Sequence, residues 1–153
     1  MAQVQTDQPV HSLIVPTANM PLLVPSASIA EVINVGELVS LPLTPDWCLG
    51  VIGWRQRAVP VVSFEALMGN PAQGPTPRSK IIIFFPIPGR KDFEFFGVLS
   101  SSEPQPHTVS SDDGLVTAQT DSPIIAAAFE LGGVTVGVPD YQVLQSAFYP
   151  DSG

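Results

Sequence analysis

The chain has 153 residues, enough for one domain or for two small subdomains that share a core. Six basic against fourteen acidic residues give a formal net charge of −8, which disfavours nucleic acid and anionic lipid as partners. Only 13% of the residues are charged while 44% are apolar, so the apolar residues either build a large core, which composition alone favours, or lie partly on a surface that another protein covers.

Short β-branched runs between prolines and glycines predict strands along most of the chain. Seventeen prolines and twelve glycines punctuate the sequence, and proline breaks helix interiors. In chain order, the predicted strands cover residues 12–15, 20–24, 50–54, 59–64, 81–85, 93–99, 126–131 and 134–138. This spacing is typical of barrels or a sandwich rather than of alternating strands and helices.

The segments between these strands contain two weak helix signals and two loops. Ser28 and Glu31 have the spacing of a capping box, although the same residues could end a strand. Asp140 follows a proline and is a typical N-cap for a short C-terminal helix. The Pro/Gly-rich stretch 70–79 separates two strand-rich halves, and residues 100–114 are expected to form a mobile loop or a short irregular edge.

Few residues of the sequence have the spacing that catalysis or metal binding requires. His11 and His107 are far apart and are expected in exposed loops, and Asp112 and Asp113 lack the spacing of a calcium loop. Cys48, the single cysteine, is expected to be a buried, unreactive residue and cannot form an internal disulfide. We therefore expect no enzyme, no cofactor and no metal. With no signal peptide and no apolar run near the ~18 residues of a membrane span, we expect a cytoplasmic protein without direct membrane contact.

The most distinctive segment is residues 45–69, PDWCLGVIGWRQRAVPVVSFEALMG. It predicts two strands around the polar tip at residues 55–57. Gly50 and Gly53 permit a bulge or a close backbone approach, and Pro60 indicates an edge or a position without a ladder hydrogen bond.

This segment resembles the signature of the CheW-like domain family, P-x-x-x-x-G-V-x-N-L-R-G-x-V-V-P-V-x-D-L-R followed by an L-G turn. The residues in register are Pro45, Gly50, Val51, Arg55, Val59, Pro60, Val61, Leu67 and Gly69. The chain departs from the family pattern at several places: N-L-R-G is G-W-R-Q at residues 53–56, D-L-R is S-F-E at residues 63–65, and the Asp usual after a later G-L-L-V strand is replaced within S-S-S at residues 100–102. The resemblance covers residues 12–148 and indicates a divergent paralogue, such as an adaptor of a pilus-motility array.

The resemblance implies an all-β fold of two small intertwined five-stranded β-barrels with a short C-terminal helix. The first barrel would come mainly from residues 20–69 and the second mainly from residues 80–138, with flexible termini at 1–11 and 149–153. It also implies a non-enzymatic signalling adaptor that binds the regulatory domain of a CheA-type histidine kinase and the cytoplasmic tip of a chemoreceptor. The alternatives are an OB-like nucleic-acid binder, which the low number of cations disfavours, and a barrel that binds a small ligand.

The expected partner-binding residues lie around the tip of this segment: Arg55, Trp54, Gln56, Val51, Val59 and Glu31. Arg55 is interpreted as a partner contact, as a salt bridge to Glu31, or as both, and the charged groups of the pair are expected within about 4 Å. Trp54 is either an exposed anchor or a core residue, with the core favoured. Arg57 and Lys80 are expected to be solvated surface charges.

Overall fold

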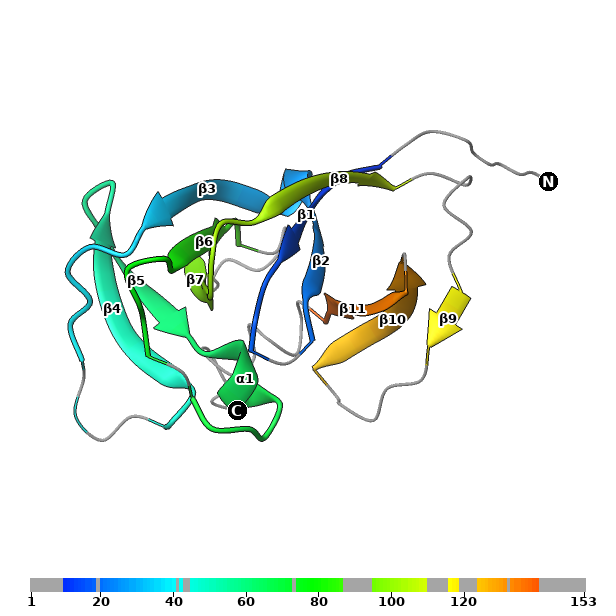
Figure 1. Cartoon of the computed structure of the whole chain (residues 1–153). Coiled ribbons are helices and arrows are strands. Elements are labelled where there is room, and N and C mark those ends of the chain that lie inside the picture. Colours follow the sequence, from blue (N-terminus) through cyan, green and yellow to red (C-terminus); the bar gives the residue numbers. More distant parts are fainter. Residues whose placement is uncertain are drawn as a thin grey trace, which may run out of the picture.

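The computed structural model describes residues 10–18, 20–40, 42, 45–72, 74–86, 95–109, 116–118, 124–131 and 133–140. Strands dominate this part of the chain (Figure 1). They are β1 (Val10–Val15), β2 (Leu22–Pro25), β3 (Ile29–Asn34), β4 (Cys48–Trp54), β5 (Arg57–Val62), β6 (Lys80–Phe84), β7 (Phe96–Ser100), β8 (Gln105–Val109), β9 (Val116–Ala118), β10 (Ile125–Leu131) and β11 (Val134–Pro139). A 3₁₀ turn covers Ser26–Ser28, and the helix α1 covers Phe64–Leu67. No helix in these ranges is long and apolar enough to cross a membrane.

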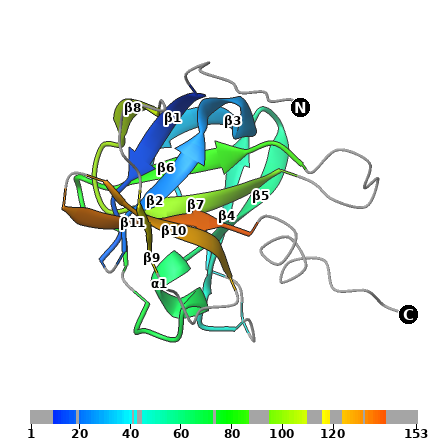
Figure 2. The ribbon, with the colours of Figure 1, turned by 90° about the vertical axis from the view of Figure 1, so that its right-hand side faces the viewer.

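The strands form two interleaved sheets. One sheet has six strands in the order β8-β1-β2-β11-β10-β9, and the other has five in the order β3-β6-β7-β5-β4. Each sheet takes two strands from the other half of the chain, since β1 and β2 join β8–β11 while β6 and β7 join β3–β5. The join between β2 and β11 is parallel (Figure 2). The all-β fold of two intertwined units is confirmed, although one sheet has a sixth strand and neither ladder closes among the described strands.

Some predicted elements differ from the observed ones. The helix signal at Ser28 is wrong, because Val32 and Ile33 lie in β3 and pair with β6. Residues 105–109, within the segment expected as a loop or short irregular edge, form the regular strand β8, which pairs with β1 along its whole length. The strand expected at 59–64 ends at Val62, since Ser63 accepts a hydrogen bond from the Ala66 amide and caps α1.

The ends of the chain are described only in part. β1 begins at Val10, so residues 10 and 11 belong to a strand rather than to the expected N-terminal tail. The predicted C-terminal helix after Asp140 and the predicted flexible ends at 1–9 and 149–153 lie outside the described residues.

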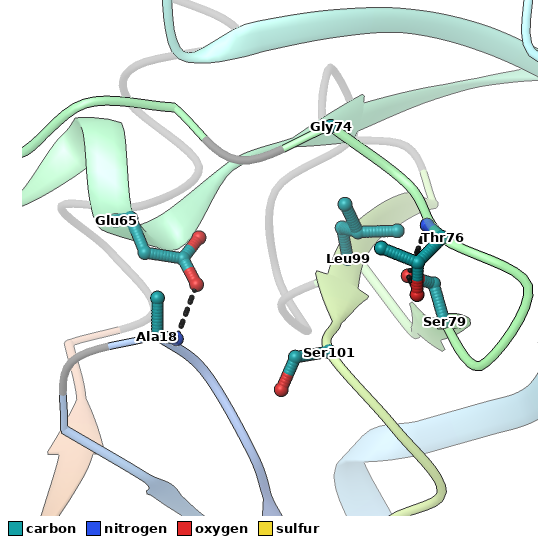
Figure 3. Close-up of a pocket in the computed structure, with 7 residues that line it drawn as sticks. All are labelled: Ala18, Glu65, Gly74, Thr76, Ser79, Leu99 and Ser101. Atoms are coloured by element: carbon teal, nitrogen blue, oxygen red, sulfur yellow. Dashed lines mark hydrogen bonds between the residues drawn. The ribbon is translucent and has the colours of Figure 1, made fainter.

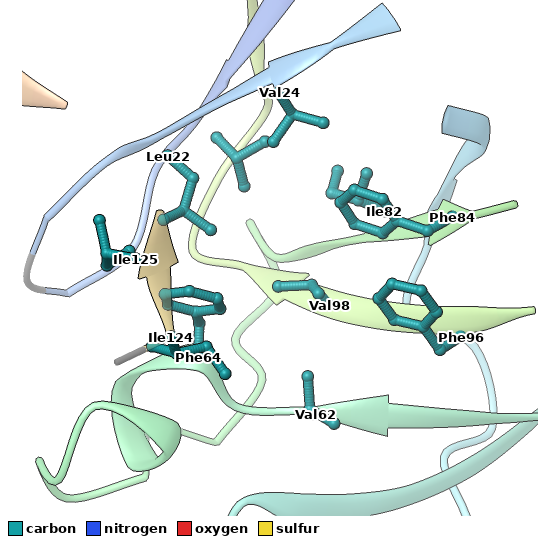
Figure 4. Packing of buried hydrophobic residues seen from close by; sticks show 11 residues of the cluster. Leu22, Val24, Val62, Phe64, Ile82, Phe84, Phe96, Val98, Ile124 and Ile125 are labelled. Carbon is teal, nitrogen blue, oxygen red and sulfur yellow. The ribbon is translucent and has the colours of Figure 1, made fainter. Parts of the chain in front are cut away.

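The five-stranded sheet is buried on both faces, which explains the uninterrupted apolar run of β6. Successive strand residues point to opposite faces, so Ile82 and Phe84 join one core while Ile81 and Ile83 join the other. The first core lies between the two sheets, and Phe84 stacks on Phe96 there with ring centroids 5.0 Å apart (Figure 4). The second core is enclosed by β3, β4, β5, β6 and β7. Two cores account for much of the high apolar fraction of this chain.

Candidate protein-interaction site

The tip of the β4–β5 hairpin is a two-residue turn with a defined conformation. Trp54 pairs with Arg57 at the end of the ladder, and the intervening Arg55 and Gln56 have φ angles of 49° and 64°. Left-handed φ at both central positions is the type I′ pattern, whose twist matches that of the flanking strands. The family signature has glycine where this chain has Gln56, and here a non-glycine residue adopts a left-handed φ, which glycine adopts without steric cost. The side chains of Arg55 and Gln56 are exposed to solvent.

Glu31 connects the two edge strands of the five-stranded sheet through one carboxylate oxygen. Its Oε1 accepts a hydrogen bond from Trp54 Nε1 at 2.9 Å and lies 3.3 Å from Arg55 Nη2. β3 and β4 are the opposite edge strands of the sheet. These side-chain contacts therefore connect its two edges at the end where the hairpin tip lies. The predicted ion pair between Glu31 and Arg55 is confirmed. The Arg55 side chain remains 65% exposed, so a partner can still reach it.

The other expected site residues divide into buried and accessible ones. Trp54 belongs to the second core, which confirms the core alternative for this residue, and Val59 is buried beside it. The Arg55 guanidinium carbon lies 4.6 Å from the centroid of the Trp54 ring, so the guanidinium makes a cation–π contact with this ring. Val51 is half-buried and forms an isolated bridge with Val39. Glu31, Arg55 and Gln56 are therefore the exposed members of the expected set.

The structure brings three residues to this end of the sheet that were not among the expected site residues: Arg57, Phe85 and Phe95. The Arg57 guanidinium carbon lies 5.1 Å from the centroid of the Phe95 ring, so this arginine is not the simple solvated charge expected. Phe95 lies 4.9 Å from Trp54 and 5.9 Å from Phe85, centroid to centroid. Phe85 is 48% exposed. No local pattern connects these residues, because they meet only through the pairing of β5 and β6 with β7.

Other expectations about polar residues also change. His11 and His107 lie in β1 and β8 rather than in loops, and their register places them on opposite faces of this strand pair. Lys80 is paired with Glu103 and contacts Asn34 instead of being simply solvated. In the described ranges, no three His, Cys, Asp or Glu side chains are grouped so that they could hold a metal ion.

A small cavity of about 90 Å³ lies beside α1 (Figure 3). Its lining residues come from the β1–β2 connection, from α1, from the connector before β6 and from the end of β7: Ala18, Glu65, Gly74, Thr76, Ser79, Leu99 and Ser101. The Glu65 carboxylate accepts hydrogen bonds from the Ala18 amide at 2.6 Å and from Ser63 Oγ at 3.1 Å. Because ligand pockets usually measure roughly 300–1,000 Å³, this cavity does not support a small-ligand barrel.

Comparison with known proteins gives consistent results. A family model described as a CheW-like domain matches residues 11–91, more than half of the chain. Among curated proteins, the chain is similar to Protein FrzA of Myxococcus xanthus, with 31% identity over 65 residues. That match spans 42% of this chain and only 41% of FrzA. Among solved structures, the chain is similar to the scaffolding protein TtCheW from Thermoanaerobacter tengcongensis, with a TM-score of 0.74. This likeness covers 97% of this chain and 93% of TtCheW at 16% identity, and it shows the fold.

Proposed function

This chain belongs to the CheW-like domain family, and on that premise we propose that it is a non-enzymatic, cytoplasmic adaptor of a chemosensory array. In this role it couples chemoreceptors to a CheA-type histidine kinase by binding the regulatory domain of the kinase and the cytoplasmic tip of the receptor. The departures from the family signature at residues 53–56 and 63–65 favour a divergent array, such as one that controls pilus motility.

The presentation of Arg55 is the observation that best supports this proposal. A left-handed turn, a carboxylate at 3.3 Å and the ring of Trp54 hold its guanidinium in one place, yet most of the side chain is exposed. Arginine is enriched among the residues that dominate binding energy at interfaces, and a guanidinium held in position before binding loses less entropy there. This arrangement suits a contact that a protein partner recognises.

We expect Arg55→Ala to weaken partner binding by about 1–2 kcal/mol, roughly tenfold or more in Kd, while leaving the melting temperature nearly unchanged. Thermal stability is expected to change little because an exposed ion pair contributes only ~0–1 kcal/mol. The measurement is a melting curve and a calorimetric titration of one sample with the kinase regulatory domain, for which the wild type should show micromolar affinity.

Arg78→Ala is the matched control, since Arg78 is exposed and lies before β6, at the end opposite Phe85. Unchanged binding by Arg55→Ala would remove Arg55 from the interface, and a large drop in melting temperature would make it a structural brace. If the wild-type chain binds neither its cognate kinase domain nor the receptor tip at high concentration, the adaptor proposal is wrong.

A further inference from the structure

The two edge strands of the five-stranded sheet meet at a junction that no backbone ladder crosses. β3 and β4, both described along their whole length, do not pair with each other, yet Glu31 of β3 contacts Trp54 and Arg55 at the end of β4. We name this junction the β3–β4 boundary. The second core contains side chains of both strands, such as Ile33 and Ile52, so the contacts that enclose the core between them come from side chains.

The outer backbone groups of β4 are paired at one position and unpaired at the next. In a two-residue hairpin the residues that flank the turn form a hydrogen-bonded pair, and pairs alternate from there, so Gly53 and Val51 direct their N–H and C=O groups away from β5. Pro60, which lies opposite Val51 and has no N–H group, fits this alternation. Val51 uses these groups in two hydrogen bonds of 2.9 Å with Val39. Gly53 is exposed, and in the described part of the chain no ladder or bridge continues along this edge beyond Val51.

Glu31 therefore joins the two strands beyond Val51. Its Oε1 accepts the indole N–H of Trp54 at 2.9 Å, and Trp54 is only 7% exposed. A buried N–H group without an acceptor is costly, so loss of this acceptor favours an arrangement in which the indole reaches water. The Glu31 side chain is itself 43% exposed, so water can compete for its carboxylate. Contacts of this kind are among the first to open in a folded protein.

Separation at this boundary does not require the rest of the fold to open. The first core holds the two sheets together, and no residue of β4 belongs to it. The tip of the β4–β5 hairpin can therefore move away from β3 while the packing between the sheets persists.

We propose that the β3–β4 boundary opens locally in the folded protein, and that the hydrogen bond from Trp54 to Glu31 determines how often it opens. The open state exposes Trp54 and the adjoining part of the second core to solvent. Because Arg55 lies on the same hairpin tip, opening also moves the residue on which the proposed adaptor function depends. Only this last step rests on that function.

Hydrogen exchange measured by NMR on the full chain tests the inference, with the indole N–H of Trp54 as the probe. Glu31→Ala should accelerate exchange at this group roughly tenfold or more, because a buried donor loses its acceptor. Arg55→Ala and Glu31→Gln should have smaller effects, since both leave an oxygen acceptor at position 31. Glu103→Ala is the matched control: it removes an exposed carboxylate from another ion pair and should leave exchange at Trp54 unchanged.

The backbone amides of Ile82 and Val98, which pair within the first core, distinguish local from global opening. Their exchange should keep the wild-type rate in Glu31→Ala. Equal acceleration at these amides and at Trp54 would overturn the inference, and so would unchanged exchange at Trp54. Wild-type exchange at Trp54 as fast as in a free indole would show that the carboxylate does not hold the ring. A Glu31→Ala chain that fails to fold would also contradict a local opening.

The link to partner binding is measured with the same probe. Saturation with the kinase regulatory domain should slow exchange at Trp54, because a partner bound to Arg55 favours the closed boundary and the coupling is reciprocal. If the domain binds and exchange stays the same, this link is wrong and the adaptor proposal stands. If the chain binds neither the kinase domain nor the receptor tip, the adaptor proposal fails, and exchange in the free chain and its variants decides the inference on its own.

Discussion

Replacing Gly50 with alanine should lower the free energy of unfolding by about 3 kcal/mol or more, through a clash and a strained backbone. Gly50 has φ +142°, and a Cβ built there lies 2.8 Å from the carbonyl carbon of Val39 and closer still to its oxygen. These are backbone atoms fixed by two hydrogen bonds of 2.9 Å between Val39 and Val51. The segment cannot move aside without breaking that bridge, so relief of the clash is itself costly.

Urea unfolding of Gly50→Ala and Gly53→Ala checks this expectation. A Cβ at Gly53 meets no atom within 4 Å, so this control on the same strand should stay within about 1 kcal/mol of the wild type. For a chain of this length, a loss of 3 kcal/mol corresponds to a drop of roughly 6–12 °C in Tm. Similar losses in the two variants, or wild-type stability of Gly50→Ala, would contradict the proposed close approach.

Replacing Glu65 with alanine should lower the free energy of unfolding by about 2–4 kcal/mol. Glu65 is 3% exposed, and its two oxygens accept hydrogen bonds from the Ala18 amide and Ser63 Oγ. Alanine leaves the Ala18 amide without this acceptor, removes a link between α1 and the β1–β2 connection, and enlarges the adjoining cavity. Loss of a charged acceptor and of packing volume act in the same direction.

Two controls isolate the contribution of the buried carboxylate. Glu65→Gln keeps most of the volume and one acceptor oxygen, so its loss in stability should lie between those of alanine and the wild type. Glu103→Ala removes a carboxylate that is 65% exposed and 3.6 Å from Lys80, and it should change stability by only ~0–1 kcal/mol. Equal effects at positions 65 and 103 in thermal and urea unfolding would show that the link from Glu65 to the β1–β2 connection does not stabilise the fold.

The segment at residues 63–65 departs from the family signature, and the structure shows which contacts its replaced residues make. The signature has Asp where this chain has Ser63, and both are good N-caps, so α1 still begins after this residue. Glu65 replaces a signature arginine, and in the sequence this replacement is visible only as a departure from the family pattern. Its hydrogen bond to Ala18 depends on a residue 47 positions away, which no local pattern reveals.

The features that depend on neighbouring residues could be predicted from the sequence. Alternating β-branched runs between prolines and glycines indicate the strands, and the segment around Gly50 and Pro60 indicates the hairpin and the family. The Glu31–Arg55 pair was predictable too, because the family register places both charges beside apolar strand residues.

Which strands pair and which side chains meet became clear from the three-dimensional structure. The same residues at Ser28–Glu31 suit a helix start or a strand, and pairing with β6 selects the strand because it packs Val32 and Ile33 against the two cores. Arg57, Phe85 and Phe95 belong to three separate strand ends, so their contact requires β5, β6 and β7 to lie together in one sheet. Strand pairing depends on distant partners and on which face is buried, and a sequence records neither until the chain has folded.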